Sequence, residues 1–127
     1  MLRNPDGCIA VVRTPLGLFL PGGGRIAGES FQQAALRELR EECGLTAELE
    51  GSLGVADEFV HSEAEATWFA KRSRFFRGRA IRLDGPGEAD HALRWLGLDA
   101  AEAQLAHGSH RWAVGRERLA REGGAAI

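Results

Sequence analysis

Apolar and polar residues follow a helical period between Phe31 and Cys43, and the rest of the chain is organised around this stretch. It contains no proline, glycine or β-branched residue, so we expect a helix of about three to four turns. Ser30 is a good N-cap, Gln33 completes a capping box, and Gly44 stands where a left-handed C-cap ends a helix. The apolar face predicted to pack on a core comprises Ala35, Leu36, Leu39 and Cys43.

Most of the remaining apolar runs have the length and composition of β-strands. The first two are joined by a Pro-Leu-Gly turn and form a hairpin that leads into a glycine-rich loop. In the third strand, Gly51 and Gly54 predict bulges or kinks, and a polar hairpin tip at 61–65 follows it. The segment 67–82 is either one long strand or two pieces broken at Gly78. The expected strands cover residues 8–13, 18–20, 46–60, 67–82 and 92–98.

Two helices are expected at the carboxyl end of the chain, a short one over 100–106 and a last one ending at Arg121. The last helix should pack on the sheet face opposite the helix at 31–43. Its predicted core stripe comprises Trp112, Ala113, Leu119 and Ala120.

Three carboxylates share a second face of the helix at 31–43, because Glu38, Glu41 and Glu42 stand at positions i, i+3 and i+4. Like charges at this spacing oppose helix formation unless a cation binds between them. Oxygen ligands converging from one helix suit Mg²⁺ or Mn²⁺. The preceding run 21–24 (PGGG) can turn a carbonyl toward that metal and let a phosphate approach closely.

The glycine run and the acidic helix together resemble the Nudix box, G-x5-E-x7-R-E-U-x-E-E-x-G-U, where U is aliphatic. The resemblance covers residues 23–45 and implies one Nudix domain over 1–127. It implies an α+β fold, an α/β/α sandwich with a mixed sheet between the box helix and the C-terminal helices. Family members usually begin with a further strand, so 1–4 is either a stub of it or the sheet lacks it. The residues at the defined positions are Gly23, Glu29, Arg37, Glu38, Leu39, Glu41, Glu42, Gly44 and Leu45.

The resemblance also implies a reaction, the Mg²⁺- or Mn²⁺-dependent hydrolysis of a pyrophosphate bond in a nucleoside diphosphate linked to another moiety. Water attacks phosphorus, and the metal ligands are the carbonyl of Gly23 and the three helix glutamates, with help from Glu29. Arg37 pairs with a box glutamate and fixes its rotamer. The general base stays open between Glu38, Glu41 and an acid of a later loop. The ligands and catalytic residues so implied are Gly23, Arg37, Glu38, Glu41 and Glu42.

Substrate contacts are expected outside the box. Glu88 or Asp90, in the loop after the long basic strand, resembles a later-loop metal ligand or base, and a solvated loop acid is the alternative. Arg72 and Arg74 in that strand are candidates for bidentate phosphate binding, and a solvated charged face is the alternative.

Sub-family features leave the substrate open. The Pro typical of ADP-ribose pyrophosphatases is replaced by Val60, and the chain has no Tyr of the kind dinucleoside polyphosphate hydrolases carry. A nucleoside triphosphate or a small nucleoside diphosphate derivative is therefore the default. The alternatives are an RNA 5′-end pyrophosphohydrolase, suggested by the basic segment, and a non-catalytic nucleotide-binding domain.

Composition narrows the class of protein. The 127 residues have 44% hydrophobic and 27% charged side chains, and no apolar run has the length of a membrane span. The net charge of −2 argues against a dedicated nucleic-acid binder. We expect a cytoplasmic protein that acts on a small nucleotide. A sheet lacking its first strand would expose an edge, which suggests a homodimer.

Overall fold

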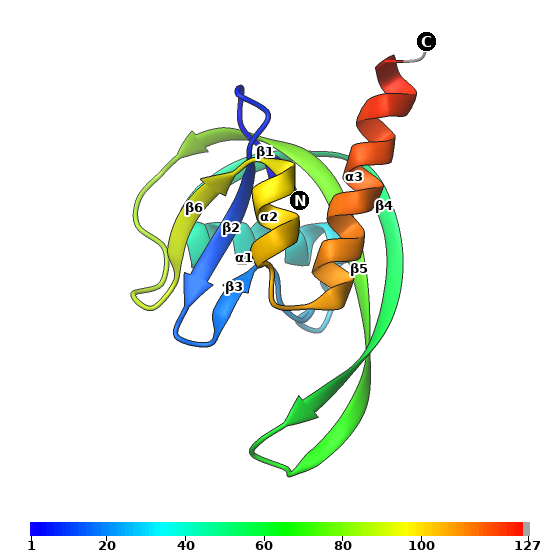
Figure 1. Ribbon diagram of the computed structural model, residues 1–127. Helices are drawn as coiled ribbons and strands as arrows, with labels where there is room; N and C mark the ends of the chain where they lie inside the picture. Colours follow the sequence, from blue (N-terminus) through cyan, green and yellow to red (C-terminus); the bar gives the residue numbers. More distant parts are fainter. Residues whose placement is uncertain (126–127) are drawn as a thin grey trace.

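A computed structural model of the chain describes residues 1–125, and it shows one mixed sheet between two layers of helices (Figure 1). Helix α1 (Phe31–Cys43) covers one face of the sheet. Helices α2 (Leu98–Gln104) and α3 (Gly108–Ala125) cover the other. The predicted α+β sandwich is confirmed, with the box helix and the C-terminal helices on opposite faces.

The sheet has six strands, ordered β3-β2-β1-β5-β4, and β6 pairs with β2 outside this path. The pairing of β1 with β5 is parallel, and every other pairing is antiparallel. The strands are β1 (Leu2–Arg3), β2 (Ile9–Thr14), β3 (Gly17–Phe19), β4 (Leu45–Ser62), β5 (Thr67–Leu83) and β6 (Ala92–Leu96).

The first strand of the family fold is present as a stub. Strand β1 lies between β2 and β5, with Arg3 opposite Ile9 on one side and Leu2 opposite Gly78 on the other. Because β1 is paired on both sides, the exposed edge that suggested a homodimer is absent from the described sheet. That basis for the homodimer prediction is therefore wrong.

Strand β2 is buried on both faces, which explains its continuous apolar run. Ile9 and Val11 pack with the buried residues of α2 and α3. Ala10 and Val12 point to the other face and pack with Leu39 and other buried residues of α1. The core of the molecule therefore holds α1 rigidly against the sheet, which fixes the face that carries the acids.

The ends of α1 follow the sequence prediction. Ser30 accepts a hydrogen bond from the backbone of Gln33 (3.0 Å), and the Gln33 side chain accepts one from the backbone of Ser30 (2.8 Å). Gly44 has a left-handed φ of 67°, and its N–H caps the last turn. These local interactions set where the helix begins and ends.

Strands β4 and β5 form a long antiparallel ribbon whose far end projects from the body of the molecule (Figure 1). Register shifts occur between Leu49 and Gly51 and between Ser52 and Gly54, where the glycines predicted a kink. Glu58 ties the ribbon to the start of α3, because its carboxylate accepts hydrogen bonds from the N–H groups of Gly108 and Ser109 (3.1 and 3.3 Å).

The predicted core stripe of the last helix is partly wrong. Ala113 is fully buried, but Trp112 and Leu119 are 40% and 58% exposed. The buried face instead runs through Val114 and Glu117. None of the helices in residues 1–125 combines the length and apolar character needed to cross a membrane.

Candidate active site

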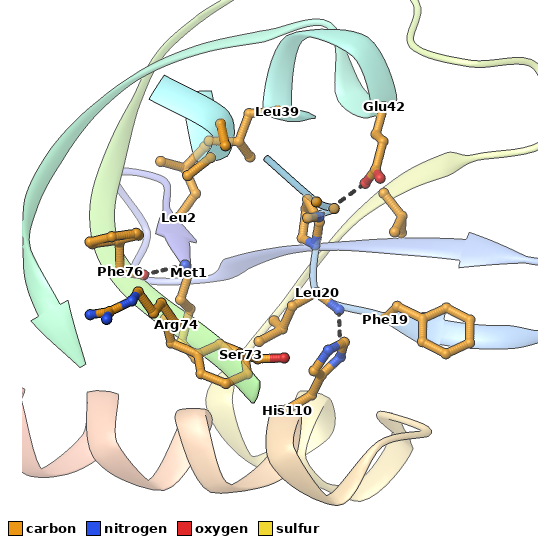
Figure 2. A pocket seen from close by; sticks show the side chains of 18 of the residues that line it. Met1, Leu2, Phe19, Leu20, Leu39, Glu42, Ser73, Arg74, Phe76 and His110 are labelled. Atoms are coloured by element: carbon orange, nitrogen blue, oxygen red, sulfur yellow. Dashed lines mark hydrogen bonds between the residues drawn. The ribbon is translucent and has the colours of Figure 1, made fainter. Parts of the chain in front are cut away.

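A cavity of about 490 Å³ lies between one face of α1, the glycine loop and the middle of β5. Figure 2 shows Glu42 reaching into it from α1, and His110 reaching toward it from α3 on the opposite side. Ala34, on the same helix, is buried in the cavity wall. The predicted glycine loop and acidic helix therefore border the same cavity.

Glu38 and Glu42 converge on the glycine loop. The N–H of Gly22 donates a hydrogen bond to Glu42 Oε2 (3.2 Å). A Cβ at position 23 would lie only 2.5 Å from Glu38 Oε1, so a larger residue would require this carboxylate to shift away from the loop. The structure thus brings Gly23, Glu38 and Glu42 together as the sequence predicted.

Arg37 holds the other acids in place. Its guanidinium makes two hydrogen bonds to Glu29 (2.7 and 3.0 Å), and its Nη1 bonds both Glu38 Oε1 (2.8 Å) and Glu41 Oε2 (3.0 Å). Its Nη2 also donates to the carbonyl of Gly24 (2.8 Å). Hydrogen bonding to Glu29 is the main reason that the pKa of Arg37 rises above its ordinary value. Arg37 is therefore a positioning residue that joins the loop to the helix.

Glu29 occupies a different place from the other acids. Both of its carboxylate oxygens accept hydrogen bonds from Arg37, and Oε1 also accepts from the N–H of Ile26 (2.9 Å). The Arg37 bonds also lower the pKa of Glu29, so it is ionised and paired. Its expected help to a metal is not supported by this geometry, because protein donors already occupy both oxygens.

Glu42 is buried beside another acid. Glu42 is only 8% exposed, and burial raises the pKa of its carboxyl group to about 7 despite the hydrogen bond from Gly22. The charge of the neighbouring Glu38 raises the pKa further. The hydrogen bond from Gly22 offsets only part of the cost of burying an ionised carboxylate here. A bound cation would therefore stabilise the ionised form of Glu42.

The loop after β5 lies against the end of α1. The N–H of Glu88 donates to the carbonyl of Glu41 (3.1 Å), and a Cβ at Gly87 would lie 1.8 Å from the Glu42 carbonyl. His91 Nδ1 lies 3.2 Å from Glu88 Oε2 and 3.1 Å from Asp90 Oδ1. The backbone of this loop therefore lies against the C-terminal end of the box helix. The side chains of Glu88 and Asp90 are 48% and 72% exposed, and His91, which sequence reasoning missed, lines the cavity.

The two arginines predicted to bind phosphate differ. Arg72 makes a bidentate ion pair with Asp57 (2.8 and 3.0 Å) on the adjacent strand. The guanidinium of Arg74 instead lies 4.3 Å from the centre of the Phe31 ring. Nothing in the sequence distinguishes these two arginines, because the register that places Asp57 opposite Arg72 is a property of the sheet.

A wall of aromatic and histidine rings closes the side of the cavity near α3. The N–H of Leu20 donates to His110 Nδ1 (3.1 Å), which requires the neutral ring to carry its proton on Nε2. Burial lowers the pKa of His110 to about 4, so the ring stays neutral. His107 lies beside it and beside Phe19, with ring centres 5.0 Å apart in both pairs. Both histidines therefore form part of the cavity wall.

Comparison with known proteins supports the resemblance seen in the sequence. A family model described as the NUDIX domain matches residues 1–114. Over 38 residues the chain is 55% identical to "Nudix hydrolase 21, chloroplastic" of Arabidopsis thaliana. That alignment covers 30% of this chain and only 19% of the length of the relative.

Solved structures share the fold. A NUDIX hydrolase from Nitrosomonas europaea has a TM-score of 0.72 at 21% identity, over 94% of this chain and 85% of that chain. The E. coli dihydroneopterin triphosphate pyrophosphohydrolase has a TM-score of 0.73 at 20% identity, over 89% and 87% of the two chains. At such identities the likeness shows the fold alone. Because the family model matches most of the sequence and the fold agrees, the chain belongs to the Nudix family of hydrolases.

Proposed function

We propose that this protein hydrolyses a pyrophosphate bond in a nucleoside diphosphate linked to another moiety, with Mg²⁺ or Mn²⁺ as cofactor. The observation that carries the proposal is the pair of carboxylates, Glu38 and Glu42, that meets the glycine loop, with Glu42 lining the cavity. The name of one structural relative, a dihydroneopterin triphosphate pyrophosphohydrolase, supports the same reaction type. A nucleoside triphosphate or a small nucleoside diphosphate derivative is the proposed substrate.

The residues present fit a divalent cation. Glu38, Glu41 and Glu42 offer hard oxygen ligands, and Arg37 is the one cation among residues 1–125 that hydrogen-bonds within this group. Burial raises the pKa of Glu42 to about 7, which supports the proposal because a nearby cation would favour its ionised form. These three glutamates and the carbonyl of Gly23 would hold the ion. When bound, such an ion neutralises charge on phosphate oxygens and acidifies a water molecule.

The chain's own residues supply orientation and proton transfer. Arg37 hydrogen-bonds to Glu38 and Glu41 and so restricts the rotamers of both side chains. The proton of the attacking water passes to a carboxylate, for which Glu38, Glu41 and an acid of the later loop are the candidates. Glu88 belongs to this group because its backbone is bonded to that of Glu41.

The two alternative functions receive less support. Most arginines of β5 that suggested RNA binding are paired with acids, as in Arg72 with Asp57 and Arg79 with Glu48. Such pairs reduce the charge available for phosphates along the ribbon. A non-catalytic domain is disfavoured because every glutamate of the box is present.

The test is a panel of nucleoside triphosphates and nucleoside diphosphate derivatives, incubated with Mg²⁺, with Mn²⁺ or with EDTA, with products identified by mass spectrometry. We expect turnover of at least one class with metal and none with EDTA. Reaction in ¹⁸O-labelled water should place the label on a phosphate product, since water attacks phosphorus. Turnover that persists in EDTA, or a folded protein that turns over no compound with either metal, would refute the proposal.

A further inference from the structure

Two arginines at the cavity converge on one aromatic ring. The guanidinium carbon of Arg25 lies 4.0 Å from the centre of the Phe31 ring, and that of Arg74 lies 4.3 Å from it. All three residues line the cavity. Arg25 follows the glycine run directly, Phe31 begins α1, and Arg74 comes from β5, so three separate elements meet at this point.

Neither arginine has a carboxylate partner among the described residues, although the chain pairs its other β5 arginines. Each of the remaining four contacts an acid: Arg72, Arg77, Arg79 and Arg82 bond to Asp57, Glu117, Glu48 and Asp84. Arg74 is therefore the exception within its strand. Contact with the face of Phe31 orients the two guanidinium groups but leaves their hydrogen-bond donors free for another acceptor.

Holding two positive charges at one ring is unfavourable unless an anion binds there, just as the glutamates of α1 are unfavourable without a cation. The cavity consequently has an acidic end at Glu42 and Gly23 and a basic end at Arg25 and Arg74. The two ends are joined by the glycine loop, in which Arg25 stands two residues after Gly23. A ligand that spans the cavity would therefore lie near the proposed metal ligands at one end and near the two guanidinium groups at the other.

We propose that Arg25 and Arg74 bind a further phosphate group of the substrate, beyond the pyrophosphate held at the acidic end. The inference rests on the proposed function and narrows it to substrates with an extended phosphate chain, of the nucleoside triphosphate class. Guanidinium groups suit this task because their planar donors match phosphate oxygens. A nucleoside diphosphate joined to an uncharged sugar has no group to place between these two arginines.

Steady-state kinetics with Mg²⁺ test the assignment by comparing a nucleoside triphosphate with a nucleoside diphosphate sugar. Arg25→Gln and Arg74→Gln should each raise KM for the triphosphate about tenfold, the loss expected for one charge-assisted contact. Values of kcat/KM for the sugar derivative should change less than about twofold, because the contact is absent there. The matched control is Arg79→Gln, which removes an arginine of the same strand that is paired with Glu48 and lies outside the cavity. It should leave both substrates unaffected.

Calorimetric binding of inorganic tripolyphosphate to the full chain in EDTA separates this inference from the proposed function. Binding by the unmodified protein should weaken in Arg25→Gln and Arg74→Gln, recover partly in Arg74→Lys, and stay unchanged in Arg79→Gln. Equal binding in all variants, or KM increases of the same size for both substrate classes, would overturn the inference even if the enzyme is active. If no nucleotide is hydrolysed but the two variants lose tripolyphosphate binding, the proposed function fails and the anion site stands.

Discussion

Two glutamates are buried among the described residues, and the protein treats them in opposite ways. Glu42 on α1 is 8% exposed and Glu117 on α3 is 2% exposed. Glu117 receives two hydrogen bonds from Arg77 (2.7 and 2.9 Å) and one from Arg121 (2.8 Å). Glu42 receives one hydrogen bond from the N–H of Gly22 and lies beside the charge of Glu38.

The pKa values record this difference. Burial acts to raise the pKa of both acids. At Glu117 the bonds from Arg77 and Arg121 outweigh burial, so the pKa falls below its ordinary value. Glu42 has no hydrogen bond from an arginine, and its pKa rises to about 7. The buried charge of Glu117 is therefore compensated within the protein, by two arginines. The buried charge of Glu42 lacks such partners, so an external cation could compensate it.

The largest effect expected from this comparison is on catalysis. Glu42→Gln should lower kcat about a thousandfold, equivalent to about 4 kcal/mol in the activation free energy, because a proposed metal ligand loses its charge. Glu117→Gln should leave kcat within about twofold of the unmodified value when measured well below its unfolding temperature. The measurement is single-substrate kinetics with saturating Mg²⁺, accompanied by circular dichroism of both variants. Full activity of folded Glu42→Gln would contradict the assignment of Glu42.

The second effect is on the free energy of unfolding, to which Glu117 should contribute more than Glu42. Glu117→Ala should lower the free energy of unfolding by about 3 kcal/mol, since it leaves two arginines at a buried site without their acid. Urea denaturation followed by circular dichroism measures this loss. The matched control is Glu102→Ala, which breaks the exposed pair with Arg118 and should cost less than about 1 kcal/mol. A loss at Glu117 no larger than the control would show that its network is not stabilising.

The same contrast separates what the sequence could predict from what it could not. The beginning and end of α1 followed from Ser30, Gln33 and Gly44, because capping depends on neighbours a few residues away. Convergence of Glu38 and Glu42 on the glycine loop followed from helical spacing and from the box motif. These features are local, so a single sequence contains the information that specifies them.

The features that the sequence did not predict depend on contacts between distant segments. On α3, the burial of Glu117 depends on Arg77, which lies 40 residues earlier on β5. The same helix was expected to bury Trp112, which lies 40% exposed at its surface. Arg74 could be distinguished from Arg72 only through the strand register that gives Arg72 its partner. Arg25 carried one signal that could have been used, its position directly after the glycine run.

The last effect is the pH dependence of the free energy of unfolding. Measured in EDTA, so that no metal is bound, it tests the electrostatics of the two buried acids. The ordinary pKa of Glu42 is 4.5 and its folded value is about 7, so between these values the folded chain holds a proton that the unfolded chain releases. Stability therefore falls as the pH rises through this window and stays lower above it. Glu42→Gln removes this penalty, so it should exceed the unmodified protein in stability at pH 8 and match it at pH 4.

Glu117 should show the opposite dependence. Because its folded pKa is lowered, its contribution is present above the ordinary value of 4.5 and is lost as the pH falls through the folded value. Glu117→Gln should therefore lose most stability near neutral pH and least in acid. Adding Mg²⁺ at pH 8 should stabilise the unmodified protein and Glu117→Gln, but not Glu42→Gln, because binding to the folded state requires the Glu42 carboxylate. Parallel pH profiles for both variants would mean that the two buried acids differ in position alone and not in the charge that surrounds them.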